Sequence, residues 1–157
     1  MAVLHAEPKK LMSFGTLISS GDQILTELDI SAFRGKGRFE LDGESFTIEP
    51  EGFFRTNAVL HKGSSVIARA TQPSFFRRRF EISSAGHRLV LESEGFMGRE
   101  YVLLLGSQEI GRIQREGFTG RKLHLEFPDD MPSFLQVFVA FLVLSQVRRE
   151  AAAASGS

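Results

Sequence analysis

The chain has 157 residues, a length that suits one domain with a sizeable core. Lysine plus arginine and aspartate plus glutamate both total 19, so the overall charge gives no reason to expect a nucleic acid partner. The absence of cysteine excludes disulfides, thiol catalysis and cysteine-bound metals, and it is consistent with a reducing cytoplasm. The start of the chain, MAVLHAEPKK, has no apolar run of signal-peptide length. We therefore expect a cytoplasmic protein.

From Phe14 to Phe127 the dominant pattern is an alternation of apolar and polar residues, which is typical of half-buried strands. Turn signals separate the alternating runs, at residues 20–22, 42–43, 62–64, 85–86, 106–107 and 117–120. Asp42-Gly43 is a strong hairpin signal, because a type I′ turn needs positive φ at both central residues. The regular spacing favours an antiparallel sandwich or barrel of roughly ten to twelve strands, with no helix before Asp129.

The C-terminal segment Phe134 to Leu144 reads FLQVFVAFLVL and has Gln136 as its one polar residue. A membrane-spanning helix needs about 20 apolar residues, whereas a run of roughly 10–14 is more often a buried core helix. We predict a helix over about residues 131–150, with Asp129 or Asp130 as its cap and Pro132 in its first turn. Gln136 is expected to bond a strand residue, and residues 151–157 are expected to form a disordered tail.

These elements combine into one architecture. A barrel of roughly twelve strands has a lumen that must hold water, a ligand or a plug, and a helix that is apolar on all sides can fill it. Closure also removes exposed sheet edges. We predict a mainly β fold, a closed antiparallel β-barrel of roughly 10–12 strands around a central hydrophobic C-terminal α-helix, forming a single domain over residues 1–150.

In the order of its elements the chain resembles the tubby C-terminal-like group, which comprises tubby proteins, phospholipid scramblases and LURP-one-related proteins. The resemblance covers most of residues 1–150 and rests on the hairpin sequence RFELDGESFTIEPEGFF and on PDDMPSFLQVFVAFLVLS, in which residues 135–138 are similar to the opening of the tubby helix signature. It implies a barrel that binds phosphoinositides through surface lysine and arginine. The chain lacks the cysteine of the tubby signature and the acidic calcium-binding segment and cysteines of scramblases, so calcium-activated scrambling is not expected.

Two basic stretches are candidate sites for an anion or a lipid headgroup, because guanidinium offers forked donors to phosphate. The first is residues 75–80, FFRRRF, and the second is residues 34–38, RGKGR. On a strand, Arg78 would share one face with Phe80 while Arg79 takes the other. The alternatives are ordinary surface charge for the first stretch and a solvated turn for the second. The candidate ligand-binding residues are Arg34, Lys36, Arg38, Arg77, Arg78 and Arg79.

The sequence shows no catalytic motif: it has no G-x-S-x-G, no P-loop and no histidine pair at metal-binding spacing. We therefore expect no enzyme activity, no cofactor and no metal. The favoured hypothesis is a binding module for anionic lipid, peripheral at a membrane. One alternative is a protein-interaction or scaffold barrel, favoured if Phe53, Phe54, Phe75 and Phe76 cluster on the surface. A membrane-anchored, scramblase-like protein is a third hypothesis.

Overall fold

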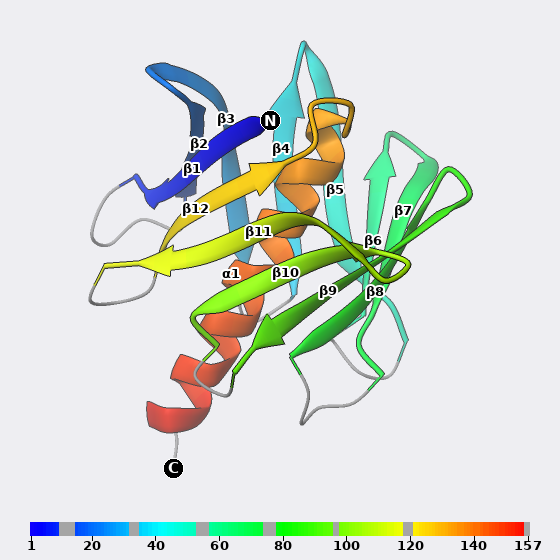
Figure 1. The fold of residues 1–157 in the computed structure, drawn as a ribbon. Helices are drawn as coiled ribbons and strands as arrows, with labels where there is room; N and C mark the ends of the chain where they lie inside the picture. The colour runs from blue at the N-terminus through cyan, green and yellow to red at the C-terminus, as the bar shows by residue number, and fades with distance from the viewer. Residues whose placement is uncertain are drawn as a thin grey trace.

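The computed structural model describes residues 1–9, 15–31, 35–52, 57–73, 78–95, 98–117 and 121–155, which form twelve strands and one helix. In chain order these elements are β1 Ala2–Pro8, β2 Gly15–Ser20, β3 Gln23–Ser31, β4 Lys36–Leu41, β5 Glu44–Pro50, β6 Ala58–Lys62, β7 Ser65–Thr71, β8 Arg79–Ser84, β9 His87–Glu94, β10 Glu100–Leu105, β11 Gln108–Glu116, β12 Lys122–Phe127 and α1 Ser133–Ser155. Consecutive strands pair antiparallel, and β1 also pairs with β12, so the sheet closes on itself (Figure 1). The predicted barrel with a central helix is confirmed.

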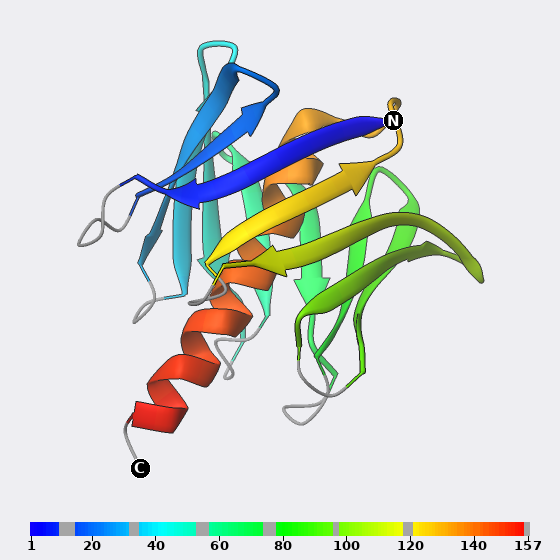
Figure 2. The ribbon, with the colours of Figure 1, turned by 60° about the vertical axis from the view of Figure 1, so that its left-hand side comes forward.

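Helix α1 runs through the barrel and fills its interior (Figures 1 and 2). Residues 137–144 are at most 3% exposed although they face every direction around the helix axis. The strands supply the surrounding wall by alternation: in β4, Gly37, Phe39 and Leu41 are buried while the residues between them are exposed. The apolar segment is therefore a plug in the barrel, as its length and composition predict.

The start of the helix differs from the prediction. Asp129 does not cap it, because its Oδ2 accepts a hydrogen bond from the N-terminal ammonium group of Met1 at 2.8 Å. The helix has no acidic residue in its first turn, and the carbonyl of Pro132 accepts the backbone N–H groups of Leu135 and Gln136 at 3.0 and 3.1 Å. The predicted acidic cap is wrong, because Asp129, which follows the last strand, is instead bound by the amino group of Met1, which precedes the first strand.

Two further predictions about the helix are corrected. Gln136 donates from Nε2 to the backbone oxygen of Met131 at 2.9 Å, so it fixes the segment that enters the barrel and bonds no strand residue. The helix begins at Ser133 and continues to Ser155. Residues 151–155 are therefore helical and not part of a disordered tail, as alanine's high helix propensity explains. Residues 156–157 lie outside the described residues.

The barrel is built from three similar four-stranded units. The hairpins β2–β3, β6–β7 and β10–β11 each contain a register shift near their tight turn, and the turns carry Gly21, Gly63 and Gly106 at φ 60, 62 and 64. Between them, β4–β5 and β8–β9 turn through Asp42 and Ala85, whose φ values of 51 and 50 are positive. By their place in the barrel, β12 and β1 correspond to the hairpins β4–β5 and β8–β9. They are the last and first strands of the chain, however, so no turn joins them. The chain enters the barrel interior at that place.

The two ends of the barrel differ in charge. One end carries the two-residue turns and the start of α1, and the other carries six longer connections and the end of α1 (Figure 2). The basic residues in or next to the tight turns are Lys62 and Arg88. The acidic residues in or next to them and the segment before α1 are Asp22, Glu40, Asp42, Glu44, Glu109, Glu126, Asp129 and Asp130. Among the described residues the tight-turn end is therefore predominantly acidic, whereas the opposite end carries a group of arginines together with acidic residues such as Glu94, Glu100, Glu116 and Glu150.

Candidate functional site

The basic end of the barrel is the candidate site. Arginines reach it from the strand ends beside the long connections and from the last turns of α1, and we call this set the arginine end. Its members are Arg78, Arg99, Arg115, Arg121, Arg148 and Arg149. They come from five separate places in the chain, and closure of the barrel around the helix brings them to one end.

Three members of the arginine end make hydrogen bonds only to neutral groups. Arg99 donates to the backbone oxygens of Arg115 and Gly117 at 3.4 and 3.1 Å. Arg148 donates to the backbone oxygen of Ile30 at 3.3 Å. Arg149 donates to the side-chain oxygens of Gln72 and Gln146 at 3.3 and 2.7 Å. Among the described residues no carboxylate lies within ion-pair distance of these three guanidinium groups.

Several of these guanidinium groups are partly removed from water. Burial lowers the pKa of Arg148, Arg149 and Arg115, because a desolvated cation is less stable than a hydrated one. The nearby charge of Arg121 lowers the pKa of Arg148 further. Arginine still remains protonated at neutral pH. The site therefore holds fixed positive charge in surroundings where water screens it weakly.

One carboxylate of the last helical turns lies within this set. Glu150 forms an ion pair with Nε of Arg78 and accepts a hydrogen bond from Gln146 Nε2 at 3.2 Å. Gln146 in turn accepts one from Gln72 Nε2 at 3.0 Å. This network ties the end of α1 to the wall beside β7 and β8. The helix is thus held by polar contacts at its exit and by apolar packing along the rest of its buried length.

Tyr101 of β10 lies opposite Ser93 of β9, whose backbone N–H donates to the backbone oxygen of Arg78 at 2.9 Å. Tyr101 is 0% exposed, and its hydroxyl group has no hydrogen-bond partner. Burial, together with the negative charge of Glu150, raises the pKa of Tyr101 to about 12, against the opposing charges of Arg78, Arg115 and Arg149. Buried hydroxyl groups nearly always have a partner. A donor without an acceptor beside four charged side chains marks a place where a ligand atom could bind.

The ionisation of Tyr101 is a direct test of this burial, because it is the single tyrosine of a chain without tryptophan. Its pKa is about 12 in the folded state, against an ordinary value of 10.0. The neutral form is favoured by folding, so the stability linked to Tyr101 is complete below about pH 10 and is lost as the pH rises towards about 12. Ultraviolet absorbance of tyrosinate should therefore titrate near 12 while circular dichroism shows folded protein. Titration of the folded protein near 10 would contradict the assigned burial.

Of the six residues that the sequence proposed as a site, the four that the structure describes do not converge on one surface. Lys36 and Arg38 lie on the outer face of β4, where Arg38 pairs with Glu40 at 3.9 Å. Arg79 lies on the outer face of β8 and pairs with Glu92 at 3.1 Å. Strands β5, β6 and β7 separate the two stretches. Arg34 and Arg77 lie outside the described residues.

Arg78 is the one described candidate that belongs to the arginine end. It takes the face opposite to Arg79, as predicted, and Phe80 is fully buried. The contact of Arg78 with Glu150 of the helix was not predicted. The glycine of the second stretch has a packing role. A Cβ atom at Gly37 would lie 2.9 Å from the ring of Phe141, so glycine lets the helix approach β4 closely. This contact accounts for Gly37 without an anion cradle.

The sequence reasoning missed most of the site. Arg148 and Arg149 suit the end of a helix dipole, and Tyr101 is part of an apolar run, so neither pattern indicates a ligand. One signal was present: the pattern G-F-x-G-R occurs at residues 95–99 and again at 117–121, directly after two strands that end at the same rim. It places Arg99 and Arg121 directly before β10 and β12, the two strands that flank β11.

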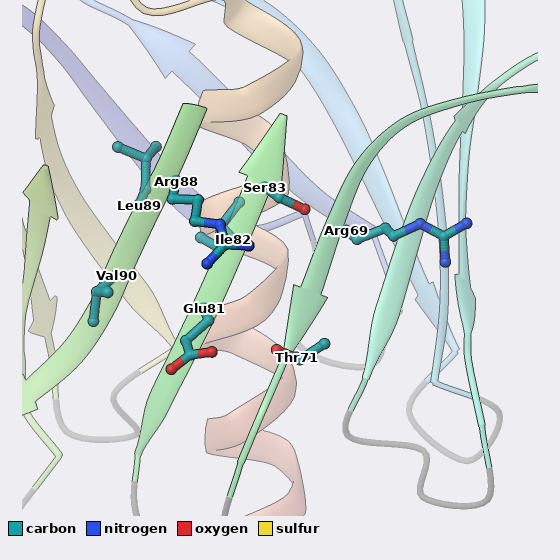
Figure 3. Close-up of a pocket in the computed structure, with 8 residues that line it drawn as sticks. All are labelled: Arg69, Thr71, Glu81, Ile82, Ser83, Arg88, Leu89 and Val90. Atoms are coloured by element: carbon teal, nitrogen blue, oxygen red, sulfur yellow. The ribbon is translucent and has the colours of Figure 1, made fainter. Parts of the chain in front are cut away.

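A hollow lies on the outer wall, where β7 and β8 pair over only three residue pairs, from Arg69 with Ser83 to Thr71 with Glu81. Its volume is about 340 Å³, and Figure 3 shows its lining, which is Arg69, Thr71, Glu81, Ile82, Ser83, Arg88, Leu89 and Val90. Arg69 points away from Glu81 in Figure 3 and forms an ion pair with Glu51. No histidine or cysteine lines the hollow, so Ser83 has no partner there of the kind that activates a nucleophile.

Other chemistries have little support in the described part of the chain. His5 and His124 form an edge contact with ring centroids 4.9 Å apart, and no group of three or more possible metal ligands occurs among the described residues. The described residues contain no helix whose length and apolarity would let it cross a membrane.

No family model matches the chain, and neither the curated proteins nor the solved structures contain a match.

Proposed function

We propose that this chain is a non-enzymatic binding module of the tubby-like type, whose arginine end binds the phosphate groups of anionic lipid headgroups such as phosphoinositides. The observation that carries the proposal is the lack of carboxylate partners for Arg99, Arg148 and Arg149 at one end of the barrel. Guanidinium groups match phosphate oxygens in geometry and charge. A phosphate at this end would supply these three guanidinium groups with the negatively charged partner that the described residues do not provide.

The charge separation along the barrel supports the same orientation. A barrel with acidic residues at the tight-turn end and basic residues at the other end would approach an anionic surface with the arginine end first. The cytoplasmic leaflet carries anionic lipid and attracts basic residues within a short distance. A cytoplasmic, peripherally associated protein is therefore part of the proposal.

The test compares two double variants with the same change in charge. The variant Arg99→Gln/Arg148→Gln removes two cations from the arginine end, and Lys62→Gln/Arg88→Gln removes two from the tight-turn end. Each basic residue near an anionic surface contributes about 1 kcal/mol, so the first variant should bind vesicles about thirtyfold more weakly. The second should bind like the unchanged protein. Cosedimentation with phosphatidylcholine vesicles, with and without phosphatidylinositol bisphosphate, measures both.

Salt dependence and specificity complete the test. Binding should weaken as ionic strength rises, because it rests on charge. Equal losses in the two variants would point to a non-specific charge effect. A lack of binding by the unchanged protein at low salt would remove the proposal.

The alternative of a protein-interaction barrel has one observation in its favour. Ile24, Val66 and Leu105 are 62%, 44% and 45% exposed, and each lies beside the turn of one of the three hairpins with a register shift. Apolar residues on three hairpin tips at one end are a possible contact for a protein partner. The triple variant Ile24→Ser/Val66→Ser/Leu105→Ser should lose that partner and keep vesicle binding. Phe53, Phe54, Phe75 and Phe76, which the sequence suggested for this role, lie outside the described residues.

A further inference from the structure

Resting on the proposed function, we propose that Glu150 is a built-in counter-ion of the arginine end, which an incoming phosphate monoester displaces from Arg78, and that Tyr101 then donates its hydroxyl hydrogen to the same phosphate. The ligand class is a phosphate monoester or phosphate dianion, carried on a lipid headgroup or free in solution. The site consists of Arg78, Tyr101, Arg115 and Arg149, with Glu150 as the internal competitor.

The first support is the position of the ion pair. The side chains of Arg78 and Glu150 are 28% and 31% exposed, so a dissolved anion can reach them. An ion pair in contact with water contributes little to stability, so its exchange for a phosphate has a small energetic cost. A phosphate carries more charge and more acceptor oxygens than a carboxylate, and it can contact several guanidinium groups at once.

The second support is the unpaired hydroxyl. The hydroxyl groups of Tyr101 and Ser145 are the two buried side-chain polar groups that have no partner in the described structure. Tyr101 is paired in register with Ser93 of β9, and the backbone N–H of Ser93 donates to the backbone oxygen of Arg78 at 2.9 Å, so Tyr101 and Arg78 are separated by one strand at the same end of the barrel. The charges of Glu150, Arg78, Arg115 and Arg149 also act on the Tyr101 hydroxyl. A phosphate in the place of the Glu150 carboxylate would bring acceptor oxygens to a donor that has none.

The third support is the location of Glu150 in the helix. Its position is beyond the apolar part of α1, and residues 151–155, which follow it, are exposed. Its remaining contact among the described residues is the hydrogen bond from Gln146. Release of its carboxylate therefore leaves the packing of residues 137–144 unchanged, and exchange of one anion for another needs no opening of the barrel.

The experiment measures the affinity of two variants that should change in opposite directions. Glu150→Gln removes the competing charge but keeps the shape of the side chain, and binding should become about tenfold tighter. Tyr101→Phe removes only the donor and should weaken binding about tenfold, the effect of one hydrogen bond to a charged group. Because the hydroxyl has no partner in the free protein, Tyr101→Phe should not lower the melting temperature.

The matched control for charge is Glu44→Gln, which breaks an exposed ion pair with Lys62 at the opposite end. This variant should bind like the unchanged protein. Calorimetry measures the binding of inositol trisphosphate and of inorganic phosphate. Cosedimentation measures the binding of phosphatidylcholine vesicles that contain phosphatidylinositol bisphosphate. Binding of vesicles and inositol trisphosphate but not of inorganic phosphate would assign a lipid headgroup, and binding of inorganic phosphate alone would assign free phosphate.

The outcomes separate this inference from the proposed function. If the unchanged protein binds and Glu150→Gln and Tyr101→Phe do not alter its affinity, the counter-ion inference is overturned and the proposed function stands. If Glu44→Gln tightens binding as much as Glu150→Gln, the effect is one of net charge and the inference is again overturned. If the unchanged protein binds no phosphate ligand in any arm, both are overturned.

Discussion

Replacement of Phe138 by alanine is expected to lower the free energy of unfolding by about 3–5 kcal/mol, the cost of removing a fully buried aromatic side chain. Phe138 is 0% exposed and lies in the part of α1 that the barrel surrounds on all sides. The wall is a sheet closed by hydrogen bonds, so it cannot move inward to fill the space that alanine would leave. Urea denaturation followed by circular dichroism measures the change.

The control for this prediction is Ile24→Ala, which removes apolar carbon from a side chain that is 62% exposed on a hairpin tip. Surface substitutions of this kind usually change stability by less than about 0.5 kcal/mol. A loss of similar size in both variants would contradict the assignment of α1 as the core. A small loss for Phe138→Ala alone would show that the wall adapts around the helix.

Removal of the whole helix is expected to have a larger effect. A chain that ends at Asp130 would keep all twelve strands but would expose their inward-facing side chains, among them Phe39, Leu60 and Phe80, to an empty lumen. Without the helix the lumen would have to hold water, and contact of water with these apolar side chains is unfavourable, so we expect insoluble or unfolded protein. The fraction of soluble protein and its far-ultraviolet circular dichroism measure this.

A shorter truncation is the matched control. A chain that ends at Glu150 loses residues 151–157, of which the described residues 151–155 are exposed, and it should fold with nearly unchanged stability. A soluble, cooperatively folded chain that ends at Asp130 would contradict the role of α1 as a plug. It would also restore the hypothesis that the helix serves as an anchor.

Local sequence patterns were sufficient to predict the barrel. Alternation along the strands identifies which side chains face inward, and the composition of residues 134–144 identifies the plug. The start of the helix was missed because Asp129 is bound by the amino group of Met1, which is distant in the sequence. That contact depends on the closure of β1 on β12, which no local pattern contains. The three similar units were also missed, although Gly21, Gly63 and Gly106 recur at nearly equal spacing.

The candidate site was harder to predict than the fold. Arg78 was identified, together with the face it takes, because alternation along a strand sets that face. Its partner Glu150 lies in the last turns of the helix, and Arg99, Arg115 and Arg149 come from other elements. Their proximity is a result of barrel closure. Tyr101 was not identified, because the lack of a hydrogen-bond partner for its hydroxyl group is visible only in three dimensions.

The central claim is that phosphate groups bind at the arginine end. Its most direct test is a chemical-shift map of the isotope-labelled protein titrated with inositol trisphosphate. The backbone amides of Tyr101, Arg115 and Arg149 should shift with a common saturation curve, while those of Gly21, Gly63 and Gly106 at the opposite end should not. Shifts concentrated at the tight turns, or no saturable shifts at low ionic strength, would contradict the claim.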